Sequence, residues 1–200
     1  MEDLINEVVD AIRNCNLKNR FESGSPGELM TMLALAANII PNAGWGWAPK
    51  VKNEETWSKD WWDEVYTNRA NGDLWFVDPV TYHIKYIDAK STSFISQKSM
   101  NGFRPDGYYL LDAWYRPTNE DYKNGKRSAI PCMVSSNEDF KNHMREHAKK
   151  RQGYDNKQGY DISFTDIKSE WIYQGFDGDA YTKLMRRVWD LSDYWSLEKA

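Results

Sequence analysis

The apolar residues of the chain follow helical spacing near the N-terminus. Residues 3–17 place apolar side chains three and four positions apart, which predicts an amphipathic helix with one face toward the core. The run from Leu29 to Ile40 is apolar nearly all round and follows Ser25 to Glu28, whose serine, proline and glutamate are typical of a helix start. We therefore expect a buried second helix there. Tryptophans at helical spacing predict a short third helix at residues 57–65.

Strand-like segments occupy the middle of the chain. Leu74 to Val77 and Tyr82 to Ala89 are rich in β-branched and aromatic residues, and Asp78 to Thr81 between them has the composition of a turn. These segments predict a β-hairpin. The apolar run from Tyr108 to Tyr115 is the best candidate for a central third strand, and Ala129 to Val134 is a candidate for a fourth.

The last third of the chain returns to helical patterns. Ser136 to Arg151 begins with capping residues and carries acids in its first turn and bases in its last, which predicts a charged surface helix. Tyr160 to Ile172 is expected to form one or two strands. Gly178 to Lys199 is expected to form a closing helix with an apolar stripe of Leu184, Val188, Leu191 and Trp195. The pattern as a whole predicts an α/β fold in a single domain over residues 1–200, with a small mixed central β-sheet flanked by helices.

The composition indicates in which compartment the protein resides and how many domains it has. A chain of 200 residues with 40% hydrophobic content suits one domain, and no apolar run approaches the roughly 20 residues that span a bilayer. We therefore expect a cytoplasmic protein. Cys15 and Cys132 match no zinc spacing and are expected to be free thiols. His143 and His147 have a spacing that can hold zinc, but no third ligand is evident.

Two aspartates and a lysine lie at the ends of the predicted hairpin strands. Either plausible register places Asp73 opposite Asp88 or one diagonal away, at roughly 5–8 Å, and strand alternation turns Lys90 to the same face. Two carboxylates that close repel each other unless a cation lies between them, and hard oxygen ligands suit Mg²⁺. A lysine beside such an ion can orient or deprotonate a water. The pattern indicates metal-assisted hydrolysis of a phosphodiester.

The same residues resemble the core motif of the PD-(D/E)xK nucleases, the restriction endonuclease-like superfamily. Gly72-Asp73 precedes a spacer of hairpin length and then Asp88-Ala89-Lys90. Gly72 stands where the motif has proline, and Asp88 stands where glutamate is commoner. The resemblance implies that Asp73, Asp88 and the backbone carbonyl of Ala89 bind Mg²⁺, for which Mn²⁺ substitutes, and that Lys90 positions the water. It also implies a DNA endonuclease of restriction or phage type, with DNA as its partner and a homodimer as its active unit.

Further residues have two interpretations each. Members of the family place a glutamate on the helix before the hairpin, where it assists the metal site. Glu28 either has that role or completes a capping box with Ser25. Glu64 is the other candidate for the same role at the metal site. The polar stretch from Ser91 to Gly107 suits phosphate contacts or an ordinary solvated loop. The basic cluster Lys149 to Arg151 is a solvated helix end or a contact with the DNA backbone.

The overall charge and the aromatic residues leave a second class of function open. A formal net charge of −4 argues against a protein that coats nucleic acid non-specifically through its overall charge. It does not exclude a nuclease, which can carry a local basic groove on a mildly acidic body. In the loop from Pro41 to Pro49, Trp45 and Trp47 either stack on bases or fold back as a lid. The alternative to a nuclease is a non-catalytic binding or inhibitor protein with a Trp/Tyr-rich surface for protein or carbohydrate.

Overall fold

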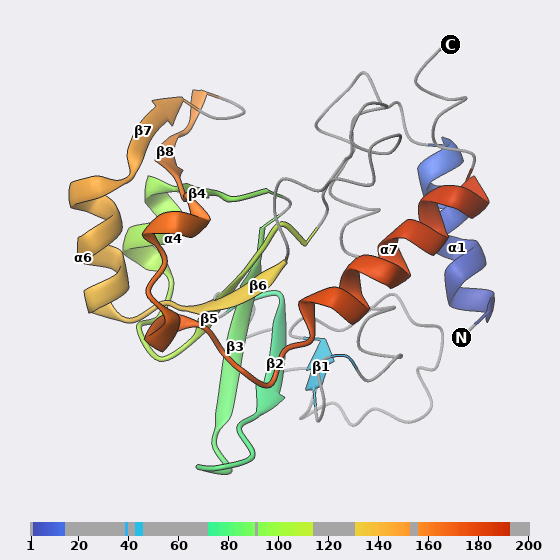
Figure 1. Ribbon diagram of the computed structural model, residues 1–200, viewed down its shortest axis with the longest axis horizontal. Coiled ribbons are helices and arrows are strands. Elements are labelled where there is room, and N and C mark those ends of the chain that lie inside the picture. Colours follow the sequence, from blue (N-terminus) through green and yellow to red (C-terminus); the bar gives the residue numbers. More distant parts are fainter. Residues whose placement is uncertain are drawn as a thin grey trace, which may run out of the picture.

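The computed structural model describes residues 2–14, 39, 43–45, 72–90, 92–113, 131–152 and 156–192. In chain order the elements are α1 (Glu2–Asn14), β1 (Ala43–Trp45), β2 (Leu74–Val77), β3 (Ile84–Ala89), β4 (Phe94–Ser96), α4 (Gln97–Gly102), β5 (Tyr108–Leu111), β6 (Cys132–Ser135), α6 (Glu138–His147), β7 (Lys149–Gln152), β8 (Gln158–Asp161), the 3₁₀ turns Phe164–Asp166 and Ser169–Trp171, and α7 (Gly178–Ser192). They form two sheets with helices packed around them (Figure 1).

The main sheet is mixed and has the strand order β1-β2-β3-β5-β6. The strands β1, β2 and β3 form an antiparallel meander, β5 runs parallel to β3, and β6 returns antiparallel to β5. The predicted hairpin, the central strand after it and the mixed character of the sheet are therefore confirmed. The strand β1 lies within the segment that was predicted to be only a loop.

The hairpin turn is longer than the sequence suggests. The carboxylate of Asp78 accepts hydrogen bonds from the backbone N–H groups of Val80 at 2.8 Å and Thr81 at 3.0 Å. These bonds, that from Thr81 most strongly, lower the pKa of Asp78. Tyr82 has φ of 56°, in the left-handed region, so β3 begins only at Ile84.

A second sheet, which the sequence patterns do not predict, contains β4, β8 and β7 in that order, all antiparallel. The polar stretch after Lys90 contains β4 and α4, so of its two interpretations that of an ordinary solvated loop was wrong over residues 94–102. The predicted helix from Ser136 to Arg151 ends at His147, because Ala148 is extended and leads the chain into β7. Likewise, the segment expected to form one or two strands contains β8 followed by two 3₁₀ turns.

Two apolar clusters lie on opposite faces of the main sheet, and β5 contributes to both. Leu110 points into the first cluster, whereas Tyr109 and Leu111 point into the second, as strand alternation requires. The first cluster joins the sheet to α1 and α7, and the second joins it to β4, α4, α6 and β8 (Figure 1). The candidate site lies where the second set of elements meets the main sheet.

Helices α1 and α7 pack against each other across the first cluster. The predicted apolar face of α1 is confirmed for Ile5, Val8 and Val9, which are buried. At the helix surface, Arg187 on α7 pairs with Glu2 at 2.7 Å, and Arg13 on α1 donates a hydrogen bond to a backbone carbonyl near the end of α7 at 2.8 Å. The two helices thus bring the beginning and the end of the described chain together.

The apolar stripe predicted for α7 is confirmed for Val188, which is buried, and for Leu184, which packs against the first cluster, but it was wrong for Leu191. The buried face of α7 consists of Tyr181, Met185, Val188, Trp189 and Ser192. Leu191, which the prediction placed in the stripe, is 46% exposed. Burying Tyr181 and Trp189 removes more apolar surface from water than burying leucines does, so the aromatic side chains decide the orientation.

Several predictions fall on residues outside the described ranges. They concern the helix at Leu29–Ile40, of which only Ile39 is described, the helix at 57–65, the thiol of Cys15, and the two candidate glutamates Glu28 and Glu64. Cys132 is described and is a free cysteine, and burial raises the pKa of its thiol to about 12. None of the helices in the described part of the chain is long and apolar enough to cross a membrane.

One charged side chain of α6 is buried, contrary to the prediction of a solvated helix. The side chain of Lys141 is 2% exposed, and its ammonium donates a hydrogen bond to the backbone carbonyl of Phe103. Glu138, one turn earlier on the helix, lies 3.5 Å from the same ammonium. Lys141 therefore holds the segment after α4, which lines the candidate site, against α6.

We expect Lys141→Met to lower the free energy of unfolding by about 1–3 kcal/mol, because the carbonyl of Phe103 loses its buried partner while the apolar stem is kept. Urea denaturation followed by tryptophan fluorescence measures the change. Lys183→Met, at an exposed position of α7, is the control and should stay within about 0.5 kcal/mol of wild type. Equal stability of the two variants would contradict the role of Lys141.

Candidate active site

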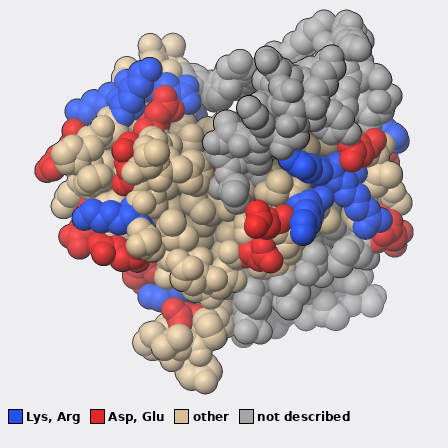
Figure 2. Space-filling view, in the orientation of Figure 1, with Lys and Arg blue, Asp and Glu red and all other residues tan. Residues whose placement is uncertain are grey.

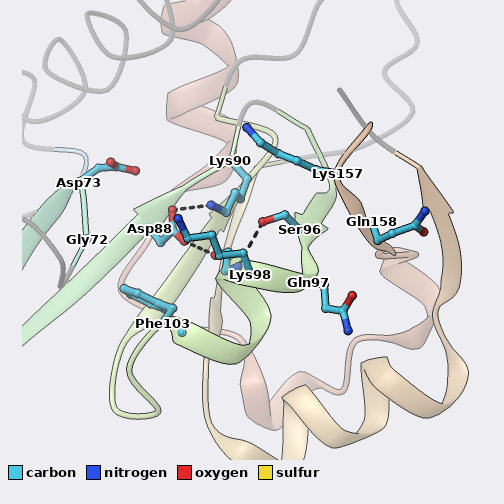
Figure 3. A pocket seen from close by; sticks show the side chains of 12 residues that line it. Gly72, Asp73, Asp88, Lys90, Ser96, Gln97, Lys98, Phe103, Lys157 and Gln158 are labelled. Carbon is cyan, nitrogen blue, oxygen red and sulfur yellow. Dashed lines mark hydrogen bonds and ion pairs between the residues drawn. The ribbon is translucent and has the colours of Figure 1, made fainter. Parts of the chain in front are cut away.

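A pocket of about 720 Å³ opens at the C-terminal end of β3, between the main sheet and the second sheet. Four segments line it: Gly72 and Asp73 before β2, Asp88 and Lys90 at the end of β3, residues 96–99 and 102–103 at and around α4, and residues 157–158 at the start of β8. Figure 3 shows these side chains around one hollow. The three residues singled out by the sequence motif thus line the same pocket.

Asp88 and Lys90 form the best-defined contact of the pocket. Strand alternation places both side chains on one face of β3, and the Nζ of Lys90 lies 2.6 Å from Oδ1 of Asp88. The other carboxylate oxygen accepts a hydrogen bond from the hydroxyl of Ser99 on α4 at 2.5 Å. Both members of the ion pair are mostly buried, with 16% of Asp88 and 21% of Lys90 exposed. The amine is therefore held in one position beside the carboxylate (Figure 3).

The position of α4 beside this pair follows from a local cap. Ser96 is the N-cap of α4, and its hydroxyl accepts a hydrogen bond from the backbone N–H of Ser99 at 3.2 Å. The same capping turn places the hydroxyl of Ser99 against Asp88. The sequence gives no local signal for this role of Ser99, because the contact depends on how α4 packs against β3.

Asp73 reaches the pocket from the other strand of the hairpin. Leu74 pairs with Ile87 in the last pair of the β2–β3 ladder, and Asp73 directly precedes that pair. The regular ladder ends there, because the N–H of Asp73 donates to the carbonyl of Ile87 at 2.8 Å. The Oδ2 of Asp73 accepts a hydrogen bond from the N–H of Ala89 at 2.9 Å. Asp73 is thus fixed to the backbone next to Asp88.

Gly72 makes this arrangement possible. Its φ of 142° is accessible to glycine and strained for other residues. A Cβ at this position would lie 2.6 Å from the carbonyl oxygen of Ile87. Proline, the residue of the family motif, has φ fixed near −65° and would not fit this conformation. The departure from the motif at Gly72 therefore has a structural reason.

The oxygen atoms at this end of the hairpin suit a hard cation. The N–H of Ala89 points toward Asp73, and in a strand the C=O of the same residue points to the same side. Two carboxylates and one carbonyl are a donor set that fits Mg²⁺, which usually keeps several waters and binds one or two carboxylates together with substrate oxygens. Among the described residues, no group of three His, Cys, Asp or Glu side chains gathers closely enough to hold a metal. Asp73, Asp88 and Ala89 would thus share such an ion with water or substrate.

Lysines make the pocket receptive to anions. Lys90, Lys98 and Lys157 line it together with the two aspartates. Figure 3 shows Lys157 extending into the hollow from the side of β8, opposite the wall that carries Asp73. Lys98 belongs to the polar stretch predicted to suit phosphate contacts. Lys157 was not predicted, because it is distant in sequence and reaches the pocket only through the pairing of β8 with β4.

Other candidate residues do not join this pocket. Arg104 stacks over the ring of Tyr86 at 4.6 Å and pairs with Asp106, which lowers the pKa of Asp106. The rings of His143 and His147 are 4.5 Å apart on α6 and do not line the pocket. The two candidate glutamates lie outside the described residues, so their roles stay predictions.

No protein-family model matches the chain, and comparison with curated proteins and with solved structures finds no similar protein.

Proposed function

We propose that this protein is a Mg²⁺-dependent DNA endonuclease that hydrolyses phosphodiester bonds, with Asp73, Asp88 and Lys90 as its catalytic residues. The observation that carries the proposal is the position of the Asp88–Lys90 pair in the same pocket as Asp73. The mixed sheet with the β2–β3 hairpin at its centre is also what a restriction endonuclease-like core would have. The resemblance adds a homodimer of restriction or phage type to the proposal, and the absence of a long apolar run in the sequence adds a cytoplasmic location.

The roles of the residues follow from their contacts. Asp73, Asp88 and the carbonyl of Ala89 would hold Mg²⁺ or Mn²⁺, which supplies positive charge beside the scissile phosphate. Asp88 places the amine of Lys90, which orients the attacking water. The water would lose a proton to solvent as its oxygen bonds to phosphorus in line with the leaving group. The bond from phosphorus to the 3′ oxygen would break, and that oxygen would take up a proton from solvent. Ser99 keeps Asp88 in position through its hydroxyl.

The test is the nicking of supercoiled plasmid DNA with Mg²⁺ or Mn²⁺. Asp88→Ala is expected to lower the rate by about 100-fold or more, because both the ion and the lysine lose their carboxylate partner. Asp106→Ala, a substitution of an aspartate that lies outside the pocket, is the matched control and should cleave at a rate close to wild type. Circular dichroism checks that both variants are folded. Absence of cleavage of plasmid, linear or single-stranded DNA by wild type would contradict the proposal.

One observation favours the alternative of a non-catalytic binding protein. The tip of the β2–β3 hairpin exposes apolar side chains, with Val80 83% and Tyr82 80% exposed, and it projects from the body in Figure 1. Exposed apolar residues of this kind suit contact with another protein. The tip lies at the opposite end of the hairpin from Asp88. Cleavage that depends on Asp88 would therefore rule out the purely non-catalytic alternative, and absence of cleavage would favour it.

A further inference from the structure

Basic side chains gather on the hairpin formed by β7 and β8. Residues 149–161 contain four basic and two acidic residues, although the whole chain has a formal net charge of −4. Figure 2 shows Lys and Arg side chains over β7, in the upper left of the view. The hairpin is therefore a local positive surface on a mildly acidic protein, and local charge determines where a polyanion approaches.

The lysines of β7 differ from its arginine in their contacts. Lys149 and Lys150 are exposed, and within the described part of the chain neither has a carboxylate at ion-pair distance. Arg151, by contrast, pairs with Asp161 on β8 and stacks over the ring of Phe94 on β4 at 4.7 Å. Arg151 therefore fixes β7 to its sheet. Lys149 and Lys150 are neighbours on the strand, so their side chains lie on opposite faces of the sheet, but β7 is the edge strand and both lysines present their charge to solvent along that edge.

The sheet that carries these lysines is well packed. Gly159 on β8 has no side chain, and a Cβ there would lie 2.4 Å from the ring of Phe94 and 2.5 Å from the carbonyl oxygen of Ile95. The ring of Phe94 consequently lies directly on the backbone of β8, beneath Arg151. This packing gives the exposed lysines a rigid support.

The basic hairpin is continuous with the candidate active site. Gln158, the first residue of β8, lines the pocket and pairs with Gln152, the last residue of β7. Lys157, which precedes β8, lines the same pocket. A polyanion such as a DNA strand that leaves the pocket past Lys157 would therefore run along the β7–β8 hairpin.

We propose that the β7–β8 hairpin binds the phosphate backbone of the DNA that flanks the scissile bond, through Lys149 and Lys150. The proposal rests on the proposed function for the identity of the polyanion. Ammonium groups on flexible stems bind phosphates as point charges and read no sequence, so this surface holds and orients the DNA. It is distinct from the residues that carry out the reaction.

The test measures binding separately from cleavage. Fluorescence anisotropy with a short labelled DNA duplex in EDTA, across a series of KCl concentrations, gives the dissociation constant and its salt dependence. We expect Lys149→Gln/Lys150→Gln to weaken binding by about tenfold at low salt. The slope of log K against log[KCl] should fall by about two, because each lysine neutralises roughly one phosphate. Lys183→Gln/Arg186→Gln removes the same charge from two exposed positions of α7, away from the hairpin, and should bind like wild type.

The outcomes separate this inference from the proposed function. Equal loss of binding in both double variants, or no binding by wild type, would overturn it. Binding of wild type to vesicles containing phosphatidylserine but not to DNA would overturn it as well and assign the surface to a membrane. Cleavage with unchanged binding in Lys149→Gln/Lys150→Gln would refute the inference alone. Lysine-dependent binding without cleavage would support it and refute the nuclease proposal alone.

Discussion

Lys90→Met is expected to lower the rate of Mg²⁺-dependent DNA cleavage by about 100-fold or more. Methionine keeps the length of the stem but removes the amine that lies 2.6 Å from Asp88. The attacking water then loses the group that orients it. Asp88 loses the ammonium group that binds one of its carboxylate oxygens, while Ser99 still binds the other. Initial rates of plasmid nicking at saturating Mg²⁺ measure the effect.

Lys85→Met provides a matched control for this substitution. Lys85 lies on the same strand, pairs with Phe76 on β2 and does not line the pocket. The same chemical change there should leave the cleavage rate within a few-fold of wild type. Comparable loss of activity in both variants would indicate that cleavage depends on the total positive charge of β3 and not on the position of one amine. The specific role assigned to Lys90 would then be wrong.

Gly72→Ala is expected to destabilise the fold by about 2–4 kcal/mol. Two effects combine, because alanine at φ of 142° is strained and its Cβ would lie 2.6 Å from the carbonyl oxygen of Ile87. The backbone must move away from β3 to relieve this clash, and Asp73 moves with it. We therefore expect weaker cleavage as well as a lower midpoint of urea denaturation.

Gly102→Ala is the control for this prediction. Gly102 lines the same pocket, but a Cβ added there meets no atom within 4 Å. Its free energy of unfolding should therefore stay close to that of wild type. Wild-type stability of Gly72→Ala would show that the backbone at the start of β2 relaxes freely, and the explanation for the missing proline would fail.

The features that depend on short stretches of sequence were predictable. The hairpin consists of two apolar and aromatic runs joined by a turn that contains Asp78 and Pro79, so its two strands and their pairing followed from the local sequence. Lys90 follows Asp88 by two positions, and alternation alone places it on the same face. The location of Asp73, Asp88 and Lys90 at one end of the hairpin could therefore be predicted from the local sequence.

The features that depend on distant partners were not predictable. Lys149 to Gln152 continue a helical charge pattern, yet they form a strand because β8 supplies the hydrogen-bonding partner. Lys157 reaches the pocket only because β8 pairs with β4. Lys141 is a charged residue in a charged helix segment, and its burial follows from its hydrogen bond to the backbone of Phe103 after α4. Single-sequence patterns contain none of these pairings.

The contact between α1 and α7 has a consequence for synthesis of the chain. The apolar face of α1 packs against side chains of α7, which the ribosome produces long after α1. A nascent chain therefore presents Ile5, Val8 and Val9 to the surrounding solution until residues 178–192 have emerged. During that interval the exposed helix is a target for chaperones and for aggregation, so expression yield should depend on temperature and chaperone supply more than the stability of the finished protein suggests.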